Sequence, residues 1–326
     1  MATRTQTYSI PSLLLLAMLG GCAGGASSSS PQGLLALPAA LTNASQGHLR
    51  SARSLPPLWI YTAQLYGEDV KVYQRNGLSL TYYETLTPGV ASPYGTVTTP
   101  DGRWYVANGG HSNVLVYRTT KYGPQGPVEV LDDYGEMPVN VTVTSSRRLV
   151  AVSNAHTMIG GAGSVSIYLN RNAEPARILR YGAHLLAGAG IALDRHGNCY
   201  WSFNDPIRIA GSIVEFAGCN GTGKLVVSGI AKAGGVAFDQ HDDLYYVDQT
   251  SGIYKCQGTS KCALFANGFG APENINFDHN HGHLWVADAT GYIDAVNPAT
   301  GAIEYSIEGA GGPHDPPFGI APAPGG

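Results

Sequence analysis

A short phrase recurs at nearly regular spacing along this chain. Its clearest copy is Gly190-Ile-Ala-Leu-Asp194, which is followed by Cys199-Tyr-Trp-Ser202. The anchor residues of the copies stand at positions 95, 140, 190, 235, 274 and 319, so the spacings are 45, 50, 45, 39 and 45 residues. A period in this range, with two short apolar strands in each unit, is typical of a β-propeller, in which similar blades surround a central channel.

The two ends of the repeat region predict how the ring closes. Residues 58–82 contain three strand patterns with no inner strand before them, and residues 318–322 contain an inner-strand pattern with nothing after it. Joined, they make one whole blade and remove an exposed sheet edge. We therefore predict an all-β fold: a six-bladed β-propeller of four-stranded blades over residues 55–326, closed by the C-terminal strand joining the N-terminal blade.

Charge is sparse in this chain. Only 13% of the residues are charged, the net charge is −4, and no cluster of Lys and Arg occurs. This composition lacks the basic patch that nucleic-acid binding needs. We expect a monomer without a nucleic-acid partner.

The N-terminal residues predict export. Arg4 and the apolar stretch Leu13–Leu19 have the form of a signal peptide, and the stretch is too short to span a bilayer. The following Leu19-Gly20-Gly21-Cys22 resembles a bacterial lipobox. This resemblance implies a lipoprotein signal peptide over residues 1–21, lipid attachment at Cys22 and anchoring in the cell envelope; the alternative is a plain secretory peptide. Residues 22–54, rich in Ala, Ser, Gly and Pro, predict a flexible tether.

Four further cysteines favour disulfides in an oxidising compartment. In the repeat map Cys199 opens one strand and Cys219 ends the next, whereas Cys256 and Cys262 flank a hairpin turn. Antiparallel neighbours bring both pairs to facing positions, so we predict Cys199–Cys219 and Cys256–Cys262. Metal binding is the alternative, but the paired short spacings of zinc sites are missing.

The repeat resembles the NHL repeat, most clearly at residues 190–203, 235–248 and 274–288. The broader similarity is to the superfamily that also includes the gluconolactonase-like propellers. Function in such propellers usually gathers at the mouth, the face where inner strands begin. We predict a binding scaffold for a small ligand, glycan or protein there, with candidate residues Asn108, His111, Asn140, Asn154, His156, Glu273, Asn274 and Asp288.

The same resemblance implies an alternative, a lactonase-type hydrolase that depends on a divalent metal. The family holds its cation with a Glu, two Asn and an Asp, and oxygen ligands suit calcium. The residues here that have this chemistry are Glu273, Asn274, Asn140 and Asp288, or Asp248 in place of Asp288. A structural explanation competes for Asn140 and Asn274, because Asn replaces Gly where the backbone is left-handed.

Histidines offer another metal hypothesis. NHL-type amidating lyases hold zinc with histidines at the channel, and His111, His156 and His314 are expected in mouth-face loops. His279, His281 and His283 fall in a turn of the opposite face and are interpreted as solvated turn residues. The recurring Asp residues after the apolar runs predict side chains that bind backbone amides of the following turns: Asp194, Asp239, Asp278, Asp248 and Asp288.

Overall fold

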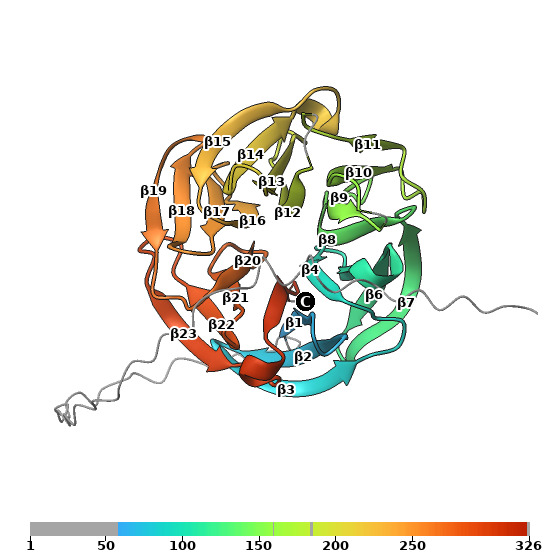
Figure 1. Ribbon diagram of the computed structural model, residues 1–326. Coiled ribbons are helices and arrows are strands. Elements are labelled where there is room, and N and C mark those ends of the chain that lie inside the picture. Colours follow the sequence, from blue (N-terminus) through green and yellow to red (C-terminus); the bar gives the residue numbers. More distant parts are fainter. Residues whose placement is uncertain (1–57, 159, 183–184, 325–326) are drawn as a thin grey trace, which may run out of the picture. The chain divides into compact units, whose positions relative to one another are not determined.

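The computed structural model describes residues 58–158, 160–182 and 185–324. In this part of the chain, 24 strands form six four-stranded antiparallel sheets, which surround a central channel as the blades of a propeller (Figure 1). The described residues also include three short 3-10 helices and no α-helix. The predicted all-β, six-bladed fold is confirmed.

Each blade runs from an inner strand at the channel to an outer edge strand. Blade 1 consists of β24 (Pro317–Pro322), β1 (Leu58–Gln64), β2 (Asp69–Asn76) and β3 (Ser79–Leu86). Blade 2 consists of β4 (Pro93–Thr98), β5 (Arg103–Asn108), β6 (Asn113–Thr120) and β7 (Gly123–Asp132). Blade 3 consists of β8 (Glu136–Val143), β9 (Leu149–Thr157), β10 (Ser164–Leu169) and β11 (Arg177–Leu179).

The remaining three blades repeat the same order. Blade 4 consists of β12 (Ala187–Leu193), β13 (Cys199–Asp205), β14 (Ala210–Phe216) and β15 (Lys224–Ile230). Blade 5 consists of β16 (Ala233–Phe238), β17 (Leu244–Asp248), β18 (Gly252–Gln257) and β19 (Ser260–Ala266). Blade 6 consists of β20 (Pro272–Phe277), β21 (Leu284–Asp288), β22 (Tyr292–Val296) and β23 (Ile303–Glu308). The 3-10 helices are η2 (Gly109–His111), η3 (Ala217–Cys219) and η4 (Gly312–His314).

The ring closes as the sequence predicts. Strand β24 pairs antiparallel with β1, so that Ile60 faces Pro322 and Ala63 faces Gly319. Six apolar clusters fill the six junctions between neighbouring blades. The cluster between blades 6 and 1 contains Trp285 and Ile60, both fully buried. Burial of apolar surface therefore continues around the whole ring, which is what holds the blades together.

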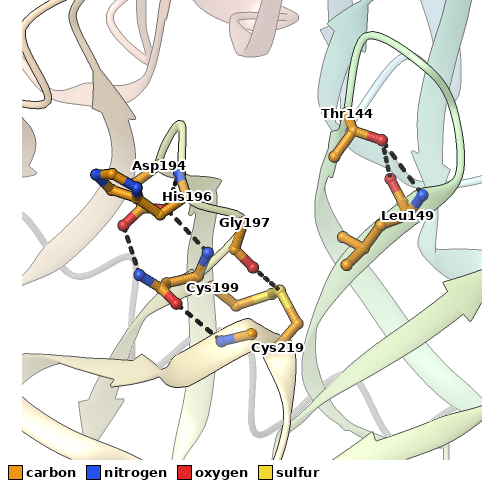
Figure 2. Close-up of a disulfide and its surroundings, with 9 residues drawn as sticks. Thr144, Leu149, Asp194, His196, Gly197, Cys199 and Cys219 are labelled. Atoms are coloured by element: carbon orange, nitrogen blue, oxygen red, sulfur yellow. Dashed lines mark hydrogen bonds between the residues drawn. A yellow bond between two sulfur atoms is a disulfide. The ribbon is translucent and has the colours of Figure 1, made fainter.

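Both predicted disulfides are confirmed. Cys199 and Cys219 are bonded with a Cα–Cα distance of 4.9 Å, and Cys256 and Cys262 with 3.9 Å. One detail differs, because Cys219 lies in η3 just after β14 and does not end the strand. Figure 2 shows the first disulfide, which ties η3 to Cys199 at the start of β13, and the turn that precedes this strand. In that turn, Asp194 accepts hydrogen bonds from the amides of His196 and Asn198 at 2.9 and 2.8 Å.

The predictions for the signal peptide, Cys22 and the tether up to residue 54 lie outside the described residues. Within the described part, no helix is long and apolar enough to cross a membrane.

Candidate functional site

The mouth face, where each inner strand begins and each second strand ends, is built from backbone bulges. All six inner strands show a register shift near their first residues, where some residues have no partner on the second strand. One such residue from each blade belongs to a set that we call the mouth ring: Tyr94, Val139, Ala189, Gly234, Glu273 and Phe318. Five of these are aromatic, aliphatic or glycine. Glu273 is the carboxylic acid of this ring.

Glu273 is partly buried, and its carboxylate accepts one short hydrogen bond. Gln249 donates a hydrogen bond to Oε2 of Glu273 at 2.6 Å. Desolvation by burial raises the pKa of Glu273 to about 7, with Lys232 opposing and Asp288 adding to the shift. Tyr94 and Phe318 lie beside each other, with ring centroids 6.1 Å apart. A carboxyl group of this kind changes charge near neutral pH and is a candidate acid or base.

Three other predicted mouth residues hold loops in place. Asp288 accepts four hydrogen bonds, from the amides of Gly270, Ala271 and Thr290 and from the Thr290 hydroxyl, at 2.6–3.0 Å. Asn108 binds the amide of Ala91 at 2.6 Å. The Asn154 amide nitrogen donates to two serine hydroxyls on β10. Each side chain connects the end of a second strand to a neighbouring strand or loop.

The histidines predicted at the mouth do not converge. His111 ends η2 in blade 2, His156 lies within β9 in blade 3, and His314 ends η4 before β24. Nδ1 of His156 is 2.7 Å from the carbonyl oxygen of Thr157, and Nδ1 of His111 is 3.2 Å from that of Gly89. No three His, Cys, Asp or Glu side chains within residues 58–158, 160–182 and 185–324 are grouped so that they would hold a metal.

Asn140 and Asn274 are inner-strand residues of blades 3 and 6, which are opposite blades of the ring. Neither has a left-handed backbone, and neither do the anchor glycines, so the structural explanation from backbone conformation is wrong. Glycine is needed at the anchor positions because neighbouring inner strands approach each other closely there. A Cβ on Gly95 would lie 2.6 Å from Cγ of Asn140, and one on Gly235 would lie 3.0 Å from Oδ1 of Asn274.

The four residues proposed as calcium ligands do not fit a cation as a set. Both oxygens of Asp288 already accept hydrogen bonds, and Oδ1 of Asn140 accepts the amide of Val141 at 2.7 Å. Glu273 is held by Gln249. A calcium ion needs six to eight oxygens directed at one point, and three of these four side chains are engaged elsewhere.

A cavity of about 360 Å³ lies in the channel beneath the two asparagines. Its walls come from the later residues of β4, β8, β12, β16 and β20, and it reaches the turn residues Pro100, His279 and His281. Asn140 and Asn274 therefore face a space that extends toward the opposite end of the channel from the mouth. The sequence singled out these two residues as mouth residues, and the cavity that they line lies on their inner side.

The turn after β20 supplies the polar groups that sequence reasoning missed. The Thr98 hydroxyl donates to the carbonyl of Pro322, so His279 must donate through Nε2, which is 2.9 Å from the Thr98 oxygen. Burial lowers the pKa of His279, partly offset by Asp278, and its neutral ring leaves Nδ1 as an acceptor. Nδ1 of His281 is buried without a hydrogen-bond partner in the described structure. The interpretation as a solvated turn residue agrees with the exposure of His279 and is wrong for the buried Nδ1 of His281.

His283, the third histidine of this turn, points away from the cavity residues. It lies between Asp278, at 3.6 Å, and Glu304, at 3.1 Å. Asp278 itself accepts the amides of Gly282 and His283, as predicted for a turn-binding Asp, and pairs with Arg75. Arg75 therefore balances the negative charge of Asp278, which also lines the cavity.

Comparison with known proteins identifies solved structures of the same fold but does not assign the chain to a family. No family profile matches the sequence, and no curated protein matches it significantly. Among solved structures, a proposed 6-phosphogluconolactonase from Bacteroides uniformis is 10% identical, covers 82% of this chain and 99% of its own, and has a TM-score of 0.56. One from Bacteroides fragilis is also 10% identical, with 83% and 99% coverage and a TM-score of 0.57.

A third similar structure is regucalcin from Agrobacterium tumefaciens, described as a calcium-binding protein. It is 12% identical, covers 67% of this chain and 74% of its own, and has a TM-score of 0.50. At these identities the likeness supports the propeller fold alone.

Proposed function

We propose that this protein is a binding protein whose channel cavity takes a small, uncharged, polyhydroxylated ligand such as a monosaccharide. The observation that carries the proposal is the cavity of about 360 Å³ with Asn140, Asn274, His279 and His281 in its lining. Volumes in this range suit small ligands, and amphipathic walls with a few fixed polar groups are typical of their sites.

The hydrogen-bonding groups of the cavity define the ligand chemistry. Asn140 retains free amide N–H donors, because only its oxygen is engaged. His279 and His281 each present an acceptor nitrogen, and the Asn274 amide offers both a donor and an acceptor. Hydroxyl groups donate and accept at once, so sugar hydroxyls match this mixture. Among the described residues, no Lys or Arg lines the cavity, and the one acidic lining residue, Asp278, is paired with Arg75, which favours an uncharged ligand.

The inner strands limit the width of the cavity. Val141, Ile191, Val236 and Ile275 come from four successive inner strands, and their side chains pack in the apolar clusters between blades, so the polar groups of these strands form most of the wall. The two Bacteroides structures with the same fold carry names that refer to a sugar lactone. That association agrees with a sugar-derived ligand for this chain.

Calorimetric titration of the full-length chain with D-glucose, D-galactose and D-gluconate tests the proposal. We expect a neutral monosaccharide to bind, and the Asn274→Leu and His281→Ala variants to weaken binding at least tenfold. His241→Ala is the matched control, because His241 occupies the equivalent turn of blade 5 and does not line the cavity. Absence of binding by all three probes, or equal losses in the control variant, would contradict the proposal.

We further propose that the protein is exported and anchored in the cell envelope through a lipid on Cys22. The two disulfides support an oxidising compartment. Expression of the Cys22→Ser variant tests the anchor. The unmodified chain should partition into detergent with the membrane fraction, whereas the variant should stay in the aqueous phase.

One observation supports a second candidate function, hydrolysis of a lactone at the mouth. Glu273, with its pKa raised to about 7 by burial, is suited to take a proton from water as the water oxygen adds to the lactone carbonyl. Cleavage of the ring C–O bond then returns the proton to the ring oxygen and leaves a hydroxy acid. A lactone hydrolysis assay on the wild type and on Glu273→Gln separates the two functions, since the variant should keep sugar binding and lose turnover.

A further inference from the structure

A buried polar cluster lies between blades 2 and 3, apart from both the mouth ring and the channel cavity. Asp133 and Glu136 are the first and last residues of the turn that connects β7 to β8, and the Glu136 amide donates to the Asp133 carbonyl at 3.0 Å. Asp133 is 0% exposed and Glu136 3%. Two carboxyl groups buried this closely must be compensated by other groups.

A chain of hydrogen bonds links this turn to Asn154 on β9. The amide nitrogen of Asn154 donates to the hydroxyls of Ser164 and Ser166 at 3.0 and 2.9 Å. The Ser166 hydroxyl lies near the Asp133 carboxylate and lowers its pKa, and the Tyr168 hydroxyl donates to Oδ1 of Asp133 at 3.0 Å. Asn154, which is 0% exposed, therefore belongs to the same cluster as the two acids.

Three oxygens of the cluster have no hydrogen-bond donor in the described structure: Oδ2 of Asp133, Oε2 of Glu136 and Oδ1 of Asn154. Each is an acceptor, and leaving a buried acceptor unsatisfied costs roughly 1–3 kcal/mol. A water molecule has two protons to donate, and a shared carboxyl proton satisfies one pair of oxygens. A cation, by contrast, can be bound by several carboxylate and amide oxygens at once.

The surroundings set the charge that such a cation must have. Arg180 pairs with the other oxygen of Glu136 at 2.8 Å and, among the described residues, is the one cationic side chain in contact with these acids. Its side chain is 45% exposed, while that of Glu136 is 4% exposed. Glu136 thus has a cationic partner at the surface side, whereas Asp133 has none among the described residues.

We propose that Asp133, Glu136 and Asn154 form a binding site for a hard cation, with calcium as the ion that fits best. Carboxylate and amide oxygens are calcium ligands, and calcium tolerates irregular geometry completed by water or carbonyl oxygens. The site would brace the junction of blades 2 and 3, because its ligands come from the connecting turn and from β9.

Calcium titration of the full-length, chelator-treated chain tests this site, with calorimetry and melting temperature as readouts. We expect one calcium ion per chain and a higher melting temperature in its presence. Asp133→Asn should weaken calcium binding at least tenfold. Asp69→Asn is the matched control, since Asp69 is also a buried acid with an oxygen that lacks a donor, but it pairs with Lys71 at 2.5 Å.

The Asn154→Asp variant keeps the test decisive if Asp133→Asn does not fold. A third carboxylate should tighten calcium binding and lower the melting temperature of the calcium-free protein. A wild type that shows neither heat nor a melting shift with calcium would overturn the proposal. Calcium binding that survives unchanged in Asp133→Asn, or that Asn154→Asp does not strengthen, would overturn it as well.

Discussion

The guanidinium group of Arg75 lies 3.3 Å from the carboxylate of Asp278, and this contact joins blade 1 to blade 6. The same guanidinium lies 4.8 Å from the ring centroid of Trp285 and donates to the Gly77 carbonyl through Nε at 2.7 Å. Both charged side chains are at least nine-tenths buried. The closing junction of the ring is therefore fastened by an ion pair as well as by apolar packing.

Replacement of Arg75 by Met should lower the free energy of unfolding by roughly 3 kcal/mol, because the Asp278 carboxylate would remain buried without its partner. Chemical denaturation of both proteins measures the difference. Lys121→Met is the control, since Lys121 also lies 4.8 Å from an aromatic ring, that of the exposed Tyr122. An equal loss in both variants would contradict the assigned role of Arg75.

The close approach of inner strands predicts the effect of a single methyl group. A Cβ on Gly319 would overlap the carbonyl of Tyr94 on β4, whereas one on Gly309 would meet its nearest neighbours at 3.4 Å, an ordinary contact. Gly319→Ala should cost about 1–3 kcal/mol through strain between β24 and β4. Gly309→Ala should change stability by less than about 0.5 kcal/mol. Thermal unfolding of the two variants compares them directly.

Asp294 predicts a pH dependence of stability. Burial raises the pKa of Asp294 to about 6, partly offset by the Ser306 hydroxyl on the paired strand. The folded protein thus binds a proton more tightly than the unfolded chain, so the stability that this group contributes is complete below about pH 4 and is lost as the pH rises through 6.

The Asp294→Asn variant should accordingly be more stable than the wild type at pH 8, by up to about 3 kcal/mol, and equal to it near pH 4. Denaturation of both proteins at a series of pH values measures the difference. A difference that stays constant with pH would show that Asp294 is not the titrating group.

The two disulfides should contribute unequally. They close loops with sequence separations of 20 and 6 residues. The loss of chain entropy in the unfolded state predicts about 3 kcal/mol for Cys199–Cys219 and about 2 kcal/mol for Cys256–Cys262. Double alanine variants of each pair, compared by denaturation under non-reducing conditions, measure both values. A larger loss for the shorter loop would indicate that native-state packing dominates.

The repeat period determined the blade count, the closure and the cysteine pairs, because each depends on the position of a residue within a blade. The same period marked Asn140 and Asn274 as exceptions to a rule of small residues at the anchor. It could not show that their amides pack over Gly95 and Gly235 and face a cavity below them, since that depends on how neighbouring inner strands approach each other.

His281 was misinterpreted for a related reason. Sequence position gives the face of the propeller on which a turn lies but not whether the turn folds inward over the channel. The cluster of Asp133, Glu136 and Asn154 was also beyond prediction as a unit. Its members belong to a turn and a strand that meet through Ser166 and Tyr168, and no local pattern encodes that meeting.

The pairing of β24 with β1 has a consequence for the order of folding. A chain that emerges with its N-terminus first exposes the inner edge of β1 until residues 317–322 are available. Blades 2 to 6 contain strands that are consecutive in sequence and can form as they appear, but blade 1 must wait. The slowest contact to form is then also the one that spans the most chain, as expected where rate depends on sequence separation. The ring of blades therefore cannot close before β24 has been synthesised, and until then the blades form an open arc.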